Sequence, residues 1–565
     1  MKLTNLNMNS FYNLKSSNKN TILIAVLSSL VVFSLNFYII AFGHLHEDAY
    51  IMFTYVENWV SNGLIGFSSG TGKSEGATDF LWMIALIGFN LLGLNVALSA
   101  AIINSIGVFA LTYLVIGVYR RFDNSLLIPL LLGLFIPISY ISQASIAGFS
   151  TAIYSTIIAC LIIVILFSKE QKIIIIPFIG LLLALIRPDG AILGVVASLS
   201  VFFLLSPSHK KNYLIFLFFS AILGLIYFLW RWNYFGELLP LPLIVKSKSD
   251  QIFPGFFSNL NFLSSIWFLV VLSVANFFSK HVSRVRLSAA VIPVLLHFII
   301  LTFVEQSQNV ASRFQSPLFV LLIILSTIFV ANWINFSKRK TFKKSKHENL
   351  LFLILPIFIL ILLPLAIKNA YSTARLVYAL TNSNYINFFP YYLSEYVDKN
   401  TKIALTEAGR LPYWIPGKKF DLVGLNTPEI AIKGVSVKYI KNLSPDLIMA
   451  HHAGLLKSLS CKIDEKYCIV RLDQLKNAAI KGSNQLYLKS NNSVKRASAA
   501  TTKFLIENYS DYTIILVRYG HTVYTHIYGL KKNSNIVLEN FFLALDKSFN
   551  SDYSLSYLQM IMEPK

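Results

Sequence analysis

The chain has 565 residues, of which 55% are hydrophobic and only 13% are charged, and its formal net charge at pH 7 is +22. Ordinary soluble domains carry about 25% charged residues, so this composition excludes a purely soluble protein. The basic balance is compatible with nucleic-acid binding, but no nucleic-acid motif accompanies it. Because positive charge gathers in the cytoplasmic loops of membrane proteins, we expect membrane lipid, and no nucleic acid, among the partners.

Long apolar runs recur from residue 21 to residue 368. A helix needs about 20 mostly apolar residues to cross the hydrocarbon layer, and a signal peptide would account for only one such run. The runs therefore predict a polytopic α-helical membrane domain over 21–368. The candidate spans are 21–42, 80–94, 97–118, 126–141, 151–167, 173–186, 191–205, 213–230, 263–278, 287–303, 317–334 and 350–367.

Two lysine-bearing segments predict the orientation of the chain. Residues 1–20 and the loop 337–347 are both expected on the cytoplasmic side, so an even number of spans separates them. The last span, after this loop, makes the total odd. We expect about 11, with the proline-containing segment 126–148 bent or re-entrant. The first outer loop is then 43–79, and the tail 369–565 lies outside the cytoplasm.

The tail 369–565 contains no apolar run long enough to span. Short, partly alternating segments separated by turn residues predict a soluble α/β domain. These segments are 402–405, 446–449, 468–472 and 513–518. An extracytoplasmic tail would allow a disulfide between Cys461 and Cys468, and two separate thiols are the alternative. His451 and His452 have no evident third ligand, so we expect no metal.

The first outer loop begins with adjacent acids, Glu47 and Asp48, preceded by His46. Because adjacent carboxylates repel, one tends to keep its proton, and the other can act as a general base. Ordinary polarity at a helix end is the alternative interpretation. The following stretch 49–64 suits an amphipathic helix on the membrane surface, with its aromatic residues at the headgroup level.

Charged residues also interrupt or border the apolar runs. Arg187 and Asp189 separate two apolar halves, and charge at membrane depth usually lines a functional cavity; a structural ion pair is the alternative. Cations near helix ends often extend toward water, so Arg231, Lys246 and Arg313 are weak signals individually. Together these cations could hold an anionic phosphate.

The order of the motifs resembles the GT-C superfamily of polyprenyl-phosphate-sugar-dependent glycosyltransferases. Within it, the chain most resembles the branch of the mycobacterial terminal arabinofuranosyltransferases and related bacterial envelope proteins. The similar segments are 47–51, Tyr55, Asn58, 75–82, 147–151, 187–190, 231–240, 246–247, 313–314, Pro317, 407–413 and 421–426. Each motif is modest, and their number and order between about 43 and 429 carry the resemblance.

The resemblance implies an inverting glycosyltransferase of the bacterial cytoplasmic (inner) membrane. A sugar on polyprenyl phosphate would be the donor, an envelope glycan or glycolipid the acceptor, and no metal or other cofactor is implied. Asp48 or Glu47 would be the catalytic base. Donor phosphate or sugar contacts would come from Arg187, Arg231, Lys246 and Arg313, and acceptor or loop positioning from Glu75, Tyr50 and His46.

The sequence departs from the family pattern in three places. Glu47 replaces the first acid of an Asp-Asp pair, and Asp189 replaces a glutamate. The segment 148–151 lacks the acid of the usual Gly-Met-Glu-Thr, which leaves the substrate, and activity itself, open. A noncatalytic GT-C-like scaffold or binding subunit is therefore one alternative. A lipid-linked-sugar flippase is the other, although the inverted repeats typical of transporters are not evident.

Overall fold

The computed structural model describes residues 17–247, 252–278, 282–306, 308–340, 348–382, 385–451, 459, 461, 465–518, 525–550 and 557–562. Most of the N-terminal segment and of the lysine-rich loop 337–347 lies outside the described residues, and so does His452. The chain divides into two compact units, described separately here. The first comprises Met1–Phe37, Ala100–Gly224 and Gly255–Tyr378, and the second Tyr38–Ser99, Leu225–Pro254 and Ala379–Lys565.

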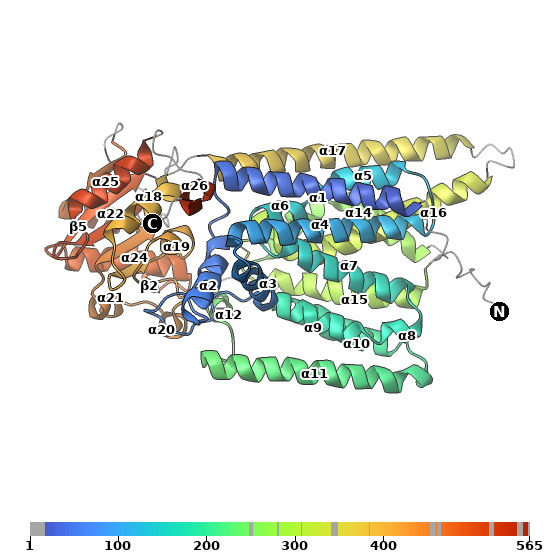
Figure 1. The fold of residues 1–565 in the computed structure, drawn as a ribbon, viewed down its shortest axis with the longest axis horizontal. Coiled ribbons are helices and arrows are strands. Elements are labelled where there is room, and N and C mark those ends of the chain that lie inside the picture. The colour runs from blue at the N-terminus through green and yellow to red at the C-terminus, as the bar shows by residue number, and fades with distance from the viewer. Residues whose placement is uncertain are drawn as a thin grey trace. The chain divides into compact units, whose positions relative to one another are not determined.

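The first unit is helical (Figure 1). Its ranges contain all or part of α1 (Ser17–Phe42), α4 (Val96–Arg120), α5 (Leu127–Phe135), α6 (Tyr140–Ile146), α7 (Thr151–Phe167), α8 (Glu170–Ile173), α9 (Ile176–Ile186), α10 (Gly190–Phe202), α11 (Pro207–Phe235), α13 (Phe256–Ser265), α14 (Trp267–Val274), α15 (Arg284–Ile300), α16 (Ser316–Lys340) and α17 (Glu348–Thr381). Helices α9 and α10 approach closely because Gly180 faces Gly194, and a β-carbon on either would meet the other's backbone. Small residues permit such contacts between apolar helices.

Within the described residues, five helices are long and apolar enough to cross a membrane. They are Lys19–Phe42, Val96–Arg120, Pro207–Phe235, Arg284–Phe303 and Val310–Asn335. The number reaches 7 if two bent helix pairs each count as one span. The predicted fold class, a polytopic helical membrane protein with a C-terminal α/β domain, is confirmed. The total of about 11 spans stays a prediction.

One bent pair lies where the prolines predicted it. Leu127–Ile138 and Tyr140–Ile146 meet at 41°. The second pair differs from the sequence prediction of one straight run over 263–278. Phe256–Ser265 and Trp267–Phe277 meet at 74°, because Ile266 between them leaves the helical conformation, with φ −124° and ψ 16°.

The second unit contains a six-stranded sheet in the order β2-β1-β3-β6-β5-β4. Strand β1 is parallel to β2 and β3, whereas β6 is antiparallel to both β3 and β5, and β4 is antiparallel to β5. The strands are β1 (Lys402–Leu405), β2 (Lys418–Asp421), β3 (Leu447–His451), β4 (Tyr467–Ile469), β5 (Tyr512–Arg518) and β6 (Thr525–Lys531). The predicted strands correspond to β1, β3, β4 and β5.

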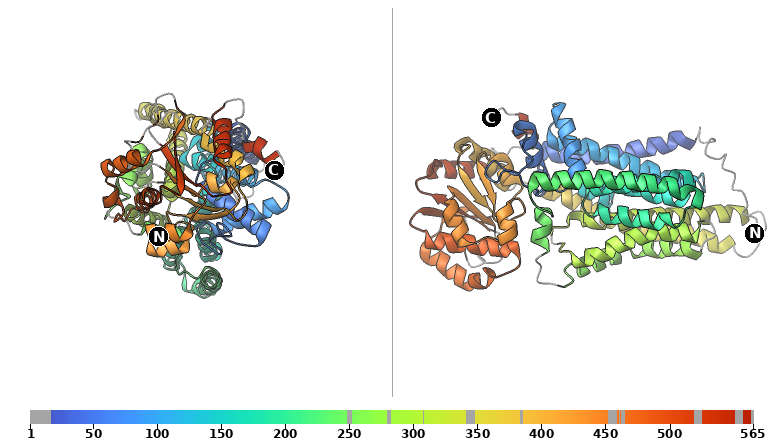
Figure 2. Two further views of the ribbon diagram at one scale, coloured as in Figure 1. Left: turned by 90° about the vertical axis from the view of Figure 1, so that its left-hand side faces the viewer. Right: turned by 90° about the horizontal axis from the view of Figure 1, so that it is seen from below.

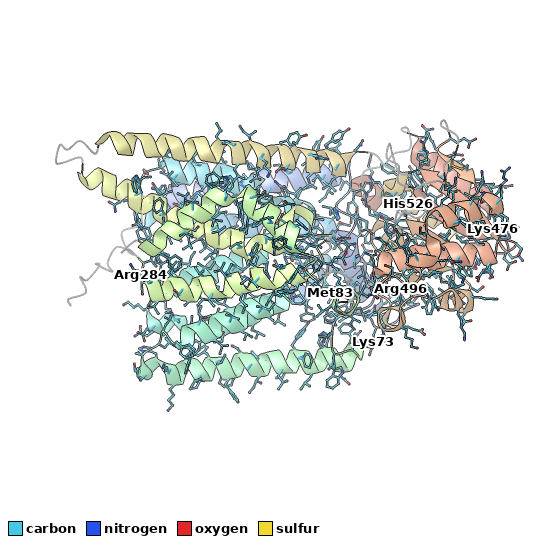
Figure 3. The ribbon with its side chains drawn as sticks, turned by 180° about the vertical axis from the view of Figure 1, so that it is seen from behind. Lys73, Met83, Arg284, Lys476, Arg496 and His526 are labelled. Carbon is cyan, nitrogen blue, oxygen red and sulfur yellow. A yellow bond between two sulfur atoms is a disulfide. The ribbon has the colours of Figure 1, made fainter. Side chains whose placement is uncertain are left out.

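Helices cover both faces of this sheet (Figure 2). Side chains alternate between the two faces along β6. Ile527 packs into the core on the side of α24 (Ser493–Glu507), whereas Tyr528 packs edge-to-face against Phe389 and Phe541 on the other side. Phe389 belongs to α18 (Tyr385–Leu393) and Phe541 to α25 (Leu538–Phe549). Figure 3 shows the side chains of this unit, with Lys476 on α22 (Leu472–Lys481), Arg496 and His526 labelled.

The second unit contains further helices besides those on the two faces named above. They are α2 (Ala49–Asn62), α3 (Phe80–Leu91), α12 (Leu241–Lys246), α19 (Arg410–Trp414), α20 (Pro428–Lys433), α21 (Val437–Leu443), α23 (Asn484–Tyr487) and α26 (Tyr557–Met562). Helix α2 forms where the amphipathic stretch predicted it. Its aromatic residues Tyr50, Phe53 and Tyr55 do not face lipid headgroups as we expected, because they are buried within the protein. The rings of Tyr50 and Phe53 pack against Tyr413.

Candidate functional site

Polar residues gather where β1, β2 and β3 end. These three strands are parallel, so their carboxyl ends meet at one edge of the sheet, which is where ligands bind in open parallel sheets. Asp421 and His451 are the last residues of β2 and β3, and Glu407 follows β1 by two residues. His526 lies opposite His451 in the antiparallel β3–β6 pair, so it reaches the same edge.

The predicted acid pair, Glu47 and Asp48, meets the segment that follows β1. A β-carbon at Gly409 would overlap both the carboxylate and the backbone carbonyl of Glu47. Glycine therefore allows the segment to lie directly against the acid. Glu47 interacts electrostatically with Glu407, Asp48 and Arg410, so the sheet-bearing part contributes one acid and one cation to the pair.

The protonation of this cluster follows from burial. Loss of water, followed by the charges of Glu407 and Asp48, raises the pKa of Glu47 well above its ordinary value, and Arg410 offsets this only in part. The protonated Glu47 side chain hydrogen-bonds Asp48. Burial raises the pKa of Glu407 to about 7, with Arg410 lowering it and Asp48 raising it. Glu47 is therefore biased toward its protonated form, and Glu407 is partly ionised near neutral pH.

Asp48 has a setting that favours negative charge. It is the N-cap residue of α2, and the partial positive charge at a helix N-terminus stabilises an anion. Its backbone N–H donates to Nδ1 of His46 at 3.3 Å. The predicted positioning residue Tyr50 lies two residues on, with its hydroxyl 3.4 Å from Nδ1 of His44. The N-terminus of α2 thus brings together the Asp48 carboxylate and a neighbouring acid, Glu47, whose pKa is raised by burial.

Glu407 continues toward the centre of the sheet. Its Oε2 lies 3.8 Å from Nε2 of His526. Nδ1 of His526 forms a short hydrogen bond with the Tyr385 hydroxyl, which lies 3.2 Å from the hydroxyl of Tyr528. A continuous series of titratable groups therefore runs from Glu407 into the protein.

Glu75 and Arg231, predicted for separate roles, form a buried ion pair. Nε of Arg231 donates to Oε1 of Glu75 at 2.6 Å, and its NH2 nitrogen lies 2.5 Å from Oε2. NH1 donates to the carbonyl of Leu238 at 2.9 Å. Burial raises the pKa of Glu75, and the bond and charge of Arg231 lower it. The pair fixes the loop that follows α2 to the end of α11.

Tyr55 fastens the same loop to the sheet-bearing part. Its hydroxyl lies 3.1 Å from Ser74 Oγ, accepts from the backbone N–H of Gly76 at 2.7 Å and donates to Asn426 Oδ1 at 3.1 Å. Asp421 in turn accepts from the Asn426 backbone and side chain. The predicted phosphate contact Lys246 is half-buried at the end of α12, whose Leu241 and Val245 pack against Ala431.

The first unit has its own polar cluster, at the junction of α9 and α10. Arg187 donates through Nε and NH2 to the two oxygens of Asp189, both at 3.1 Å, so the structural pairing considered from the sequence is present. Asp189 also contacts Nε2 of His297 on α15 at 3.0 Å. Arg187 donates through NH1 to the carbonyl of Arg313 at 3.2 Å. Two of the predicted phosphate contacts, Arg187 and Arg313, are thus brought together.

Phe149, which lies in the segment that departs from the GT-C pattern, contacts Arg313. The guanidinium of Arg313 lies 3.7 Å from the centre of the Phe149 ring, close enough for a cation–π interaction. The backbone just before it, at Ala311 and Ser312, has positive φ values of 50° and 53°. Such left-handed non-glycine residues cluster at functional sites.

The sequence did not identify His297, His526 and Tyr385 as site residues, and it reached Glu407 and Arg410 only through the family resemblance. A usable signal existed for Glu407, because it directly follows a predicted strand in a predicted α/β domain. His297 and His526 carry no local signal, since their partners lie 108 and 119 positions away in the chain.

The two thiols left open by the sequence are joined: Cys461 and Cys468 form a disulfide. Among the described residues, the one group of histidine, cysteine and acidic side chains close enough to share a metal ion is Cys461, Glu465 and Cys468. Because its sulfurs are bonded to each other, this group lacks the free thiolates that would bind a metal. His451 forms a 2.8 Å hydrogen bond with Thr406.

Comparisons with known proteins give limited matches. The model of a family described as a domain of unknown function, DUF8728, matches residues 385–518. None of the curated proteins matches the chain. Among solved structures, the chain is similar to the crystal structure of ArnT from Cupriavidus metallidurans in the apo state, with 12% identity and a TM-score of 0.44. The similarity covers 75% of this chain and 92% of that one.

Proposed function

We propose that the protein is a membrane glycosyltransferase that moves a sugar, with inversion, from polyprenyl phosphate to a hydroxyl of an envelope glycan or glycolipid. The observation that carries the proposal is the arrangement of Glu47 and Asp48: a carboxylate at a helix N-terminus beside an acid whose pKa is raised well above its ordinary value by burial. The motif order that resembles the GT-C superfamily, including the terminal arabinofuranosyltransferase branch, supports the same class of reaction.

In the proposed reaction, Asp48 is the general base. The acceptor hydroxyl oxygen attacks the anomeric carbon while its proton moves to an oxygen of Asp48. The bond between the anomeric carbon and the phosphate oxygen breaks, and the electron pair leaves with polyprenyl phosphate. Glu47 is the less suitable base because burial and the neighbouring acids raise its pKa and bias it toward the protonated form. Its hydrogen bond instead orients the Asp48 carboxylate.

The leaving phosphate needs cations, and positioned cations stabilise charge that develops in a transition state. We propose Arg187 and Arg313 in the first unit and Lys246 in the second for this role. Arg231 would contact a phosphate only by sharing its guanidinium with Glu75, which already holds it. Glu75, Tyr50 and His46 are proposed to position the loop and the acceptor.

We further propose that the reaction takes place on the outer face of the bacterial cytoplasmic membrane, with the N-terminus in the cytoplasm. The Cys461–Cys468 disulfide supports an extracytoplasmic tail, since disulfides persist in oxidising compartments and are rare in the cytosol. The lysine-rich loop 337–347 supports the same orientation.

Reconstituted protein tests the proposal. A panel of polyprenyl-phosphate sugars would be offered with envelope glycan acceptors, and released polyprenyl phosphate measured. Loss of a positioned general base lowers rates by about 10²–10⁴-fold, so Asp48→Asn should reduce release by that factor. Glu47→Gln should cost far less, because glutamine still donates a hydrogen bond to Asp48.

Glu429→Gln is the matched control, because this exposed glutamate on α20 pairs only with exposed Lys433 among the described ion pairs. Its release rate should equal that of the wild type. Release that is absent with every donor, or that is indifferent to Asp48→Asn in correctly folded protein, would favour a noncatalytic scaffold or a flippase.

A further inference from the structure

Three acids share one nearby arginine at the edge of the sheet. Glu47 and Asp48 come from the loop before α2, and Glu407 and Arg410 from the segment after β1. Oε1 of Glu47 and Oε2 of Glu407 are buried without a hydrogen-bond partner. Buried carboxylates are costly unless they are paired or neutral, and one guanidinium cannot pair three of them. The cluster must therefore retain protons, and a change at one acid redistributes them over the others.

The groups that face Glu407 connect the acid cluster to the strands of the sheet. On the side of α2 it faces Glu47 and Asp48, on α19 Arg410, and on β6 His526, while His451 lies opposite His526 on β3. The orphan Oε2 of Glu407 is the atom that lies 3.8 Å from Nε2 of His526. The Glu407 side chain is 18% exposed, but its Oε2 is buried, so this oxygen can exchange a proton with His526.

The hydrogen bond on the other side of His526 sets its tautomer. If Nδ1–H donates to the Tyr385 hydroxyl, the lone pair on Nε2 faces Glu407 and is ready to accept a proton. The Tyr385 hydroxyl can accept because it can donate in turn to Tyr528, 3.2 Å away. The sheet-bearing part thus holds a histidine oriented toward the acid cluster.

We propose that Glu407 and His526 form a proton relay that carries the acceptor's proton away from Asp48 after each sugar transfer. This inference rests on the proposed function. Asp48 first gains the acceptor's proton; that proton passes, directly or by exchange through Glu47, to the Glu407 carboxylate. Glu407 then gives it to Nε2 of His526, and Asp48 returns to its charged form. Only O–H and N–H bonds form and break. His526 then passes the proton on to bulk water before the next transfer, so water is the one further reactant.

Glu407 and His526 act through Asp48 and are therefore relay residues rather than catalytic ones. Their substitution should lower the turnover number and leave substrate binding unchanged. We expect Glu407→Gln to lower kcat at least tenfold with KM for donor and acceptor within twofold of the wild type. His526→Gln should also lower kcat without changing KM. Glu429→Gln should change neither kcat nor KM.

The pH profile distinguishes a relay from a structural role. In the wild type, kcat should rise with an ionisation near neutral pH, and in Glu407→Gln this rise should disappear. Added imidazole, a small proton acceptor, should partly restore kcat in Glu407→Gln and leave Asp48→Asn inactive. A Glu407→Gln variant that keeps the pH profile of the wild type, or that loses affinity instead of turnover, would overturn the relay.

A second measurement does not depend on activity. Infrared difference spectra of the full-length protein in lipid would follow protonated carboxyl groups as pH is varied. We expect one carboxyl that titrates near pH 7 in the wild type and is missing in Glu407→Gln. If that titration is present and no donor releases polyprenyl phosphate, the proposed function fails while the proton-sharing cluster stands. If the titration is missing in the wild type, the relay fails even in an active enzyme.

Discussion

Gly409 lies against Glu47 so closely that a methyl group on Gly409 would overlap the carboxylate and the backbone carbonyl of the acid. This contact joins two segments separated by more than 350 positions in the sequence. The backbone at Gly409, with φ −95° and ψ −102°, is not left-handed, so the requirement for glycine is one of space. The position of Glu47 is therefore set by a residue without a side chain.

Gly409→Ala should displace Glu47 and Asp48 with it. A shift of about 1 Å at a reacting group can cost about 10²-fold in rate, and we expect a loss of that size in polyprenyl phosphate release. Gly88→Ala is a control for a new methyl group in the same unit, since a β-carbon at Gly88 on α3 would meet nothing within 4 Å. Equal activity in Gly409→Ala and the wild type would contradict the close contact.

Breaking the Glu75–Arg231 pair should destabilise the protein. Removing one partner of a buried ion pair costs about 3–5 kcal/mol, because the other charge stays buried without compensation. We expect Glu75→Gln to lower the thermal unfolding midpoint in detergent clearly more than Lys433→Met, which breaks the exposed Lys433–Glu429 pair. The double variant Glu75→Leu with Arg231→Met should recover part of the loss. Equal effects of Glu75→Gln and Lys433→Met would contradict the prediction.

Stability should fall as pH rises through neutrality. The folded state holds a proton on Glu407 up to about pH 7, whereas an ordinary glutamate releases it near 4.5. A pKa that is raised in the folded state stabilises the protein fully at pH values below the unfolded-state pKa. This contribution is lost as the pH rises through the folded-state pKa. The contribution is therefore lost between pH 4.5 and 7, and its loss lowers the free energy of unfolding by on the order of 3 kcal/mol.

The measurement is the unfolding midpoint at pH 5, 6, 7 and 8 in wild type and Glu407→Gln. The wild-type midpoint should decline across this series, and the variant should decline less. A wild-type midpoint that rises with pH would contradict the proton-holding state of Glu407.

The Cys461–Cys468 disulfide should stabilise the sheet-bearing domain. It closes a short loop, since the two residues are 7 positions apart, and chain-entropy arguments give roughly 2–3 kcal/mol for such a loop. We expect the double variant Cys461→Ser with Cys468→Ser, or wild type in reductant, to unfold at lower temperature. Reductant should not affect the double variant further. A wild-type midpoint unchanged by reductant would contradict a stabilising bridge.

Local patterns predicted much of the fold and less of the site. Strands β1, β3 and β5 alternate or run apolar, and each was predictable. Strand β2 is Lys-Lys-Phe-Asp and β6 contains a glycine and a histidine, so neither has the composition typical of a strand. Both form because neighbouring strands supply hydrogen bonds to them, which is tertiary information that single-sequence patterns lack.

The same limit applies to the candidate site. Glu47 and Asp48 were predictable because they follow a span directly. The electrostatic contact of Glu47 with Glu407 was not, because it depends on the strand order of a domain more than 300 positions later. The departure at Phe149 was visible in the sequence, but only the structure places its ring over the Arg313 guanidinium.

The strand order also determines when this protein can become functional during its own synthesis. Strand β6 pairs with β3 along five residues and with β5 along seven, yet it is the last strand to leave the ribosome. Until then β3 presents an open edge, a form prone to pairing with other chains. His526 and the closed sheet arrive together, so a nascent chain halted before residue 525 would have its apolar helices and the proposed catalytic pair without a finished sheet.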